Sequence, residues 1–210
     1  LVDISASGEF GSGQQLKREF GAEIAAVLGF SAIKNNDKVG LILFSDDVEK
    51  YVVPKKGKSH VLRVIRELLY TEPERTGTSL KTALVYLLKV AKRKSVVFVI
   101  SDFLDDGYWA SLKVVNRKHD LIGIQLYDPA EMELPDMGLA KVEDPETGAA
   151  FWIDTSSLDA RKRLEKELES QHSKFKKDAR KIGFDLIPIA TNQDFVDPLM
   201  SFFRMREKRY

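Results

Sequence analysis

Continuous apolar runs that alternate with amphipathic segments are the feature that most constrains the fold of this chain. Each run is apolar at consecutive positions, which is typical of a strand buried on both faces of a parallel sheet. The runs are residues 37–45, 95–102, 120–128 and 184–191. Segments with apolar residues at helical spacing lie between or beside them, at residues 13–36, 60–70, 79–93, 108–119, 156–183 and 194–210. The alternation predicts a three-layer α/β fold with a mostly parallel central sheet and helices on both faces.

Shorter segments complete the expected sheet. Residues 1–5 have the composition of a strand, and residues 46–56 follow the run at 37–45 closely enough to be its hairpin partner. Pro54 lies in that partner and is acceptable there only near a strand end or on an edge strand. A β-hairpin insertion is predicted near residues 139–154, around the turn sequence DPETG.

No internal repeat, low-complexity tract or linker divides the 210 residues, so we expect a single domain over residues 1–210. Because Leu1 lies inside the first expected strand, we expect an N-terminally truncated piece of a longer protein. Composition narrows the class of protein further. The absence of cysteine excludes a disulfide framework, a thiolate zinc site and a cysteine nucleophile. It also fits a reducing compartment, and we expect a cytoplasmic protein, with membrane association through missing upstream residues left open.

Charge and hydropathy exclude other classes. The net charge of +1 provides no general attraction to nucleic acid or to a membrane surface. No apolar run reaches the ~18–20 residues that span a bilayer. We therefore looked for function in local side-chain patterns.

Three loops carry oxygen-bearing side chains at the ends of expected strands, where function gathers in open α/β sheets. The side chains are Asp3, Ser5 and Ser7 in the first loop, Thr76, Thr78 and Ser79 in the second, and Asp102 in the third. A set of two carboxylates and three hydroxyls drawn from these residues, without thiolate or imidazole, suits a hard cation. Mg²⁺ is the best match, at Mg–O distances of about 2.0–2.1 Å with several retained waters, and Mn²⁺ or Ca²⁺ are alternatives. A carboxylate from a protein partner would complete the coordination.

A purely structural interpretation of the same residues stays open from spacing alone. Ser5 and Ser7 are then turn residues, Thr78 is the N-cap of the following helix, and Asp102 is a turn residue at a strand end. The presence of all three loops in this order favours a site.

The residues DISAS, GTSLKTAL and VISD together resemble the metal-ion-dependent adhesion site of the von Willebrand factor A domain. The resemblance implies a von Willebrand A or Rossmann-like fold. Its metal residues correspond to Asp3, Ser5, Ser7, Thr78 and Asp102, with the serines and the threonine binding the metal directly or nearly so and the aspartates often acting through water. Phe103 is a departure, because many members have glycine after the aspartate.

A narrower resemblance covers nearly the whole chain. DISASGEFGS, ISDF and VEDPETGAAFWIDT are similar to a bacterial family called domain of unknown function number fifty-eight, whose members often stand beside MoxR-type AAA+ ATPases. The resemblance implies a metal-dependent protein–protein interaction module. Its implied role is that of an adaptor that works with such an ATPase in protein assembly or maturation.

Other classes of function were considered. A phosphate-binding loop requires a glycine pattern that Gly8, Gly11 and Gly13 do not form, so we interpret these glycines as a turn. A metal-dependent phosphoester hydrolase would use Asp3 as acceptor, but Ser5 stands where that pattern usually has a second aspartate. Serine catalysis requires a general base, and the three histidines, His60, His119 and His172, are expected at the surface. We predict no catalysis.

An RNA-binding A domain is the other alternative. The helix expected at residues 156–183 is strongly basic, which usually means a solvated helix face, and no interleaved aromatic residues support base stacking. We expect a protein partner and no DNA. Beyond the third loop, Asp105 and Asp106 are interpreted as a helix-capping cluster, and Trp109 as a possible partner contact.

Overall fold

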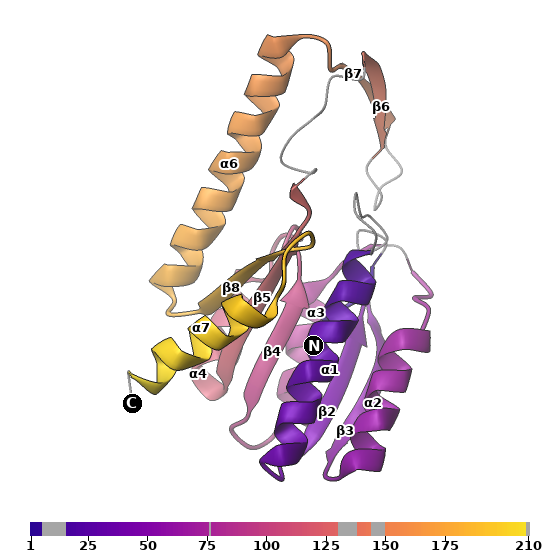
Figure 1. Ribbon diagram of the computed structural model, residues 1–210, viewed down its shortest axis with the longest axis vertical. Coiled ribbons are helices and arrows are strands. Elements are labelled where there is room, and N and C mark those ends of the chain that lie inside the picture. The colour runs from indigo at the N-terminus through magenta and orange to yellow at the C-terminus, as the bar shows by residue number, and fades with distance from the viewer. Residues whose placement is uncertain (6–15, 76, 130–137, 144–149, 209–210) are drawn as a thin grey trace.

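The computed structural model describes residues 1–5, 16–75, 77–129, 138–143 and 150–208. Figure 1 shows a central sheet with helices on both faces, which confirms the three-layer α/β class predicted above. The predicted hairpin insertion is confirmed as well. None of the described helices is long and apolar enough to cross a membrane.

The main sheet has six strands in the order β3-β2-β1-β4-β5-β8. They are β1 (Val2–Asp3), β2 (Val39–Phe44), β3 (Val48–Lys55), β4 (Val96–Ser101), β5 (Asp120–Tyr127) and β8 (Asp185–Ala190). All neighbours pair in parallel except β2 and β3, which form the antiparallel hairpin expected from the sequence. Because β3 is an edge strand, Pro54 has no second neighbouring strand to pair with.

Helices divide between the two faces of the sheet. One core cluster joins the sheet to α1 (Lys17–Lys34), α2 (Lys58–Tyr70) and α7 (Val196–Glu207). The other joins it to α3 (Leu80–Val90), α4 (Trp109–Lys118) and the end of α6 (Leu158–Lys181). The continuous apolar runs of the central strands are explained by this arrangement, since successive side chains of a strand enter opposite clusters.

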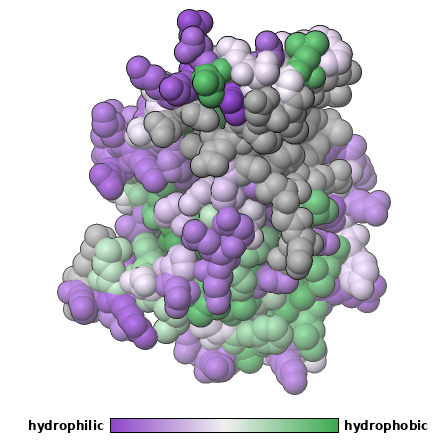
Figure 2. All heavy atoms as spheres, turned by 45° about the horizontal axis from the view of Figure 1, so that its top comes forward, coloured by the Kyte–Doolittle hydropathy of each residue, from purple (hydrophilic) through white to green (hydrophobic). Residues whose placement is uncertain are grey.

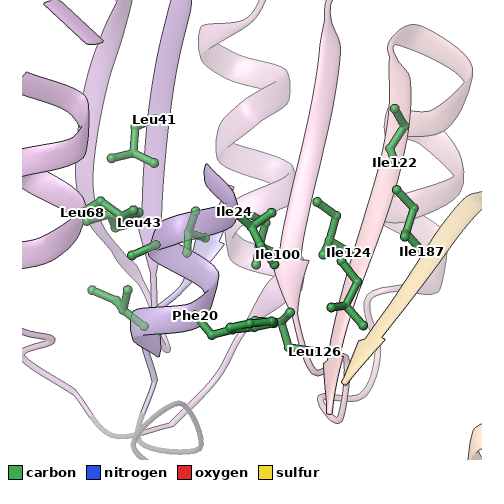
Figure 3. Packing of buried hydrophobic residues seen from close by; sticks show 14 of the residues in the cluster. Phe20, Ile24, Leu41, Leu43, Leu68, Ile100, Ile122, Ile124, Leu126 and Ile187 are labelled. Carbon is green, nitrogen blue, oxygen red and sulfur yellow. The ribbon is translucent and has the colours of Figure 1, made fainter. Parts of the chain in front are cut away.

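Helix α1, which follows the first loop, is held in place by its packing on the sheet. Phe20 and Ile24 point from α1 towards Ile100 and Leu126 of the sheet (Figure 3). Gly21 allows this close approach, because a Cβ added there would lie 3.2 Å from Leu126 and 3.3 Å from Ile100. Each buried aliphatic or aromatic side chain of this kind stabilises the fold by about 1.5–3 kcal/mol.

Strands β6 (Leu139–Glu143) and β7 (Ala150–Asp154) pair antiparallel and form a sheet of their own. In Figure 1 they lie with the start of α6 at the upper end of the molecule, beyond the carboxyl ends of the parallel strands. Gly183 follows α6 with φ 65°, a left-handed conformation that favours glycine, so it ends the helix as predicted. In Figure 2, hydrophilic residues gather at the upper left of the surface.

The basic side chains of α6 include exposed residues at both ends of the helix. Those described as exposed are Lys162, Arg163, Lys166, Lys174, Lys177, Arg180 and Lys181. Their exposure agrees with the interpretation of a solvated helix face.

Candidate metal centre

Asp3 and Ser101 lie side by side at the carboxyl edge of the sheet. The register pairs Val2 of β1 with Ile100 of β4, so the next residues on the two strands are neighbours. The Ser101 hydroxyl donates a hydrogen bond of 2.8 Å to Asp3 Oδ2, and the Ser5 N–H donates one of 3.0 Å to Asp3 Oδ1. Both carboxylate oxygens of Asp3 are therefore held in place by neighbouring residues.

The Asp3 carboxyl is short of compensating positive charge. Burial, together with the charge of Asp102, raises the pKa of Asp3 from 3.8 to about 7, although the hydrogen bonds from Ser5 and Ser101 act in the opposite direction. A cation close to the two carboxylates would favour their ionised forms, because an opposite charge nearby stabilises the charged state. The pair has the electrostatic character of a cation site.

Asp102 contacts a buried lysine. Lys17 Nζ lies 3.7 Å from Asp102 Oδ2, and the two side chains are only 3% and 8% exposed. Lys17 is the first residue of α1 and reaches the site from the helix that follows the first loop. A small pocket at this position is lined by Asp3, Lys17, Ser101 and Asp102, together with Arg18 and Gly21 of α1 and apolar residues of the sheet.

Phe103 shapes the turn that carries Asp102. Its φ is 61°, in the left-handed region that residues other than glycine rarely adopt. The Phe103 N–H donates to Ser101 Oγ at 3.1 Å, and its carbonyl accepts a 3.2 Å hydrogen bond from the Tyr108 hydroxyl. The ring is buried and lies 5.2 Å from that of Phe175. Hydrogen bonds and aromatic packing hold the strained turn, so a phenylalanine occupies a conformation suited to glycine.

The second loop is tied to the same edge of the sheet. The Ser79 N–H donates a 2.8 Å hydrogen bond to the carbonyl of Ser45, directly after β2, and the Leu80 N–H donates one of 2.9 Å to Asp105 Oδ2. Thr78 is half-buried directly before these anchors. Close packing also restricts the loop, because a Cβ at Gly77 would lie 2.3 Å from Asp46 Oδ1.

The helix caps near the site differ in two ways from the sequence interpretation. The N-cap of α3 is Ser79 and not Thr78, since the Ser79 hydroxyl accepts from the Thr82 N–H at 3.3 Å. Thr78 is therefore not used as that cap. Asp105 does cap a helix, as expected, but the helix is α3 and not the α4 that follows it, where Tyr108 is the N-cap without a side-chain bond.

The expected metal residues are placed as follows. Asp3, Ser5 and Asp102 are brought together, and Thr78 lies on a loop anchored at the same sheet edge. Ser7 and Thr76 lie outside the described residues. Within the described ranges, no three His, Cys, Asp or Glu side chains are grouped so that they could hold a metal ion. Two carboxylates with neighbouring hydroxyls nevertheless form a donor set that fits a hard cation such as Mg²⁺.

Comparisons with known proteins decide the family. The family model "Protein of unknown function DUF58" matches residues 1–174. This chain belongs to that family.

Relatives of this DUF58 chain include the uncharacterized protein Rv1480 of Mycobacterium tuberculosis, 24% identical over 213 aligned residues that cover 99% of this chain and 66% of the relative. The uncharacterized protein MAV169 of Mycobacterium avium is 25% identical over 162 residues, covering 74% of this chain and 94% of that protein. The DUF58 chain thus spans 66% of the length of Rv1480, slightly less than two thirds.

A solved structure shares the fold. The crystal structure of the conserved hypothetical protein BatB from Bacteroides thetaiotaomicron superposes with a TM-score of 0.62 and 15% sequence identity, covering 98% of the DUF58 chain and 95% of that chain. At this identity the likeness concerns the fold alone.

Two residues of the candidate site were missed by sequence reasoning. Ser101 is the residue before Asp102, and its strand-end position could have indicated it as a neighbour of Asp3. Lys17 carries no motif. Its contact with Asp102 arises from the way α1 packs on the sheet.

The histidines of the DUF58 chain are distributed differently from the prediction. His119 is 2% exposed, so its expected surface position is wrong. It precedes β5 and therefore lies at the amino edge of the sheet, opposite to Asp3. His172 contacts Gln125 Nε2 at 3.5 Å, and His60 Nε2 lies 2.9 Å from the Val39 carbonyl. His119 is the C-cap residue of α4. A buried position there is not unusual, because histidine is intermediate among the residue types in its tendency to be buried.

Trp109, interpreted from the sequence as a partner contact, packs against other aromatic rings. Its ring stacks on that of Tyr108, with centroids 5.3 Å apart, and lies 5.6 Å from that of Phe175 on α6. Together these rings join α4 to α6 beneath the third loop.

Proposed function

We propose that the DUF58 chain is a divalent-metal-dependent protein–protein interaction module of the von Willebrand A type. Its metal residues are Asp3, Ser5, Ser7, Thr78 and Asp102, and its cation is Mg²⁺, with Mn²⁺ or Ca²⁺ as substitutes. When bound, the metal provides a Lewis-acidic position to which a carboxylate of the partner attaches. The proposal extends to an adaptor role beside a MoxR-type AAA+ ATPase, which rests on the resemblance described above.

The observation that carries the proposal is the pairing of two acids at one sheet edge. Asp3 and Asp102 line the same small pocket, and the charge of Asp102 contributes to the raised pKa of Asp3. Folding has brought them together from residues 99 positions apart in the sequence (102 − 3). Like charges in a partly buried position cost free energy unless a cation compensates them.

Binding rather than catalysis fits the residues around the acids. Hydrogen bonds from the Ser5 N–H and the Ser101 hydroxyl orient the Asp3 carboxylate. His119 lies at the opposite edge of the sheet, and the other two histidines contact Val39 and Gln125. We therefore propose that this site recognises a ligand and does not turn it over.

Titration calorimetry with Mg²⁺ and Mn²⁺ tests the metal site directly. We expect one equivalent of metal to bind the unmodified chain and no binding to the double variant Asp3→Ala, Thr78→Ala. Asp37→Asn is the matched control, because Asp37 is an exposed acid before β2, at the opposite end of that strand, and should leave binding unchanged. Absence of binding, or binding that the double variant retains, would contradict the site.

A pulldown tests the role in protein recognition. Wild type and Ser5→Ala are compared as baits, in the presence of Mg²⁺ and of a chelator, in cells that contain the neighbouring ATPase. A partner that is lost in the variant and in the chelator supports the adaptor role. RNA recovered equally with both baits would favour the RNA-binding alternative.

A further inference from the structure

We propose that Lys17 is a resident counter-ion of Asp102 that competes with the divalent cation, so that Lys17 sets the metal affinity of the site. The inference rests on the proposed metal-dependent function and concerns a residue to which neither the sequence motifs nor the family resemblance assigns a role. It follows from the position of the Lys17 ammonium group beside the carboxylates.

Lys17 is buried to a degree that lysine rarely reaches. Its side chain is 3% exposed, while its Nζ lies 3.7 Å from Asp102 Oδ2. A buried ammonium group is tolerated only where a negative charge compensates the loss of hydration. Here Asp102, itself 8% exposed, provides that charge, so the two groups depend on one another.

The position of Lys17 in α1 strengthens this interpretation. It is the first residue of the helix, where the helix dipole favours acidic side chains and disfavours a cation. Its neighbours therefore have to compensate for that position. The same small pocket is lined by Asp3, Ser101 and Asp102, so the ammonium group lies among the residues that would surround a metal.

The charges of the site explain why the two cations compete. Asp3 and Asp102 together offer two negative charges when ionised, and Lys17 already compensates one of them. A divalent ion that binds beside Lys17 must overcome repulsion from the ammonium group or displace it from Asp102. Repulsion between charges a few ångströms apart is large in a partly buried site, so removal of the lysine charge should tighten metal binding substantially.

Calorimetric titration of Mn²⁺ into wild type, Lys17→Met and Lys34→Met tests the inference. Methionine keeps much of the apolar stem and removes the charge. We expect Lys17→Met to bind Mn²⁺ at least roughly tenfold more tightly than wild type. Lys34→Met removes the same charge from the exposed last turn of the same helix, about 25 Å away at 1.5 Å per residue, and should bind as wild type does.

Two further measurements separate charge from packing. Lys17→Arg keeps the positive charge and should not gain affinity, whereas Lys17→Gln, which also serves if the methionine variant does not fold, should gain it. Thermal denaturation with and without Mn²⁺ should show a larger metal-induced rise in Tm for Lys17→Met, because tighter binding to the folded state stabilises it more.

The outcomes distinguish the two levels of the proposal. Equal or weaker Mn²⁺ binding by folded Lys17→Met and Lys17→Gln would overturn the role of Lys17 and leave the metal site intact. Equal gains in Lys17→Met and Lys34→Met would overturn it too, because the effect would then be one of overall charge. Absence of metal binding in every variant would overturn the metal site and, with it, this inference.

Discussion

The Ser101 hydroxyl and the Asp3 carboxylate are joined by a 2.8 Å hydrogen bond that links the ends of the neighbouring strands β4 and β1. Ser101 Oγ also accepts from the Phe103 N–H at 3.1 Å. One buried hydroxyl thus connects the first loop to the third and orients the acid on which the proposed metal site depends.

Replacement of Ser101 by alanine should therefore destabilise the protein. It leaves Asp3 Oδ2 and the Phe103 N–H without this hydroxyl, and we expect a loss of about 1–3 kcal/mol in the free energy of unfolding, measured by urea denaturation. Ser95→Ala is the control, because its exposed hydroxyl donates to Arg93 O, and its effect should stay within about 0.5 kcal/mol. Equal effects of the two substitutions would contradict the linking role of Ser101.

Phe103 should show an inverted preference between alanine and glycine. Either substitution removes a buried ring and should cost about 3–5 kcal/mol. At φ 61°, however, glycine avoids backbone strain that alanine retains, so Phe103→Gly should be more stable than Phe103→Ala by roughly 1 kcal/mol. Chemical denaturation of both variants measures the difference.

Phe184 provides the comparison for that test. Its ring is buried beside Phe103, with centroids 6.0 Å apart, but its backbone is not among the positive-φ residues. The usual order should hold there, with Phe184→Ala more stable than Phe184→Gly. The same order at both positions would show that the left-handed turn does not determine the outcome.

Gly77→Ala should disturb the second loop through a single contact. The added Cβ would lie 2.3 Å from Asp46 Oδ1, so the exposed Asp46 side chain must turn away, at a cost of at most about 1 kcal/mol. Asp46 is exposed, so its side chain can be truncated without loss of core packing. Asp46→Ala in the Gly77→Ala chain should therefore recover much of the lost free energy of unfolding. The free energies of unfolding of wild type, both single variants and the double variant form a double-mutant cycle. If the effects of the two substitutions simply add, the contact between position 77 and Asp46 does not cause the loss.

Buried His119 should make stability depend on pH. Within the described part of the chain, neither of its ring nitrogens has a hydrogen-bond partner, and burial, aided by Lys118, lowers the pKa of His119 below 6.5. As the pH falls through 6.5, the unfolded chain takes up a proton that the folded chain resists, so stability decreases. The decrease from this residue should be at most about 1.4 kcal/mol per pH unit.

His119→Leu measures that contribution. In urea denaturation between pH 7.5 and 5.5, the free energy of unfolding of wild type should fall relative to that of the variant as the pH decreases. The lowered pKa of His172 and the raised pKa of Asp3 act in opposite directions in both proteins, so only the difference between the two proteins reports His119. Parallel curves would mean that His119 protonates as readily in the folded chain as in the unfolded one.

The sequence alone determined the layers, the parallel sheet and the sheet edge at which Asp3 and Asp102 lie. Residues 96–100 are apolar at every position because both faces of the strand are covered, and this local pattern can be recognised in the sequence. Asp3 and Asp102 could be assigned to one edge for a similar reason, since parallel strands end at the same side of a sheet.

Only the tertiary structure decided what surrounds those acids. The packing of α1 brings Lys17 to Asp102, the strand register places Ser101 against Asp3, and the fold around Phe103 holds a turn that its residue type disfavours. The cap of α3 by Asp105 and the burial of His119 arose in the same way. Each depends on contacts between distant segments, whose energies depend on mutual distance and burial and leave no periodic pattern in the sequence.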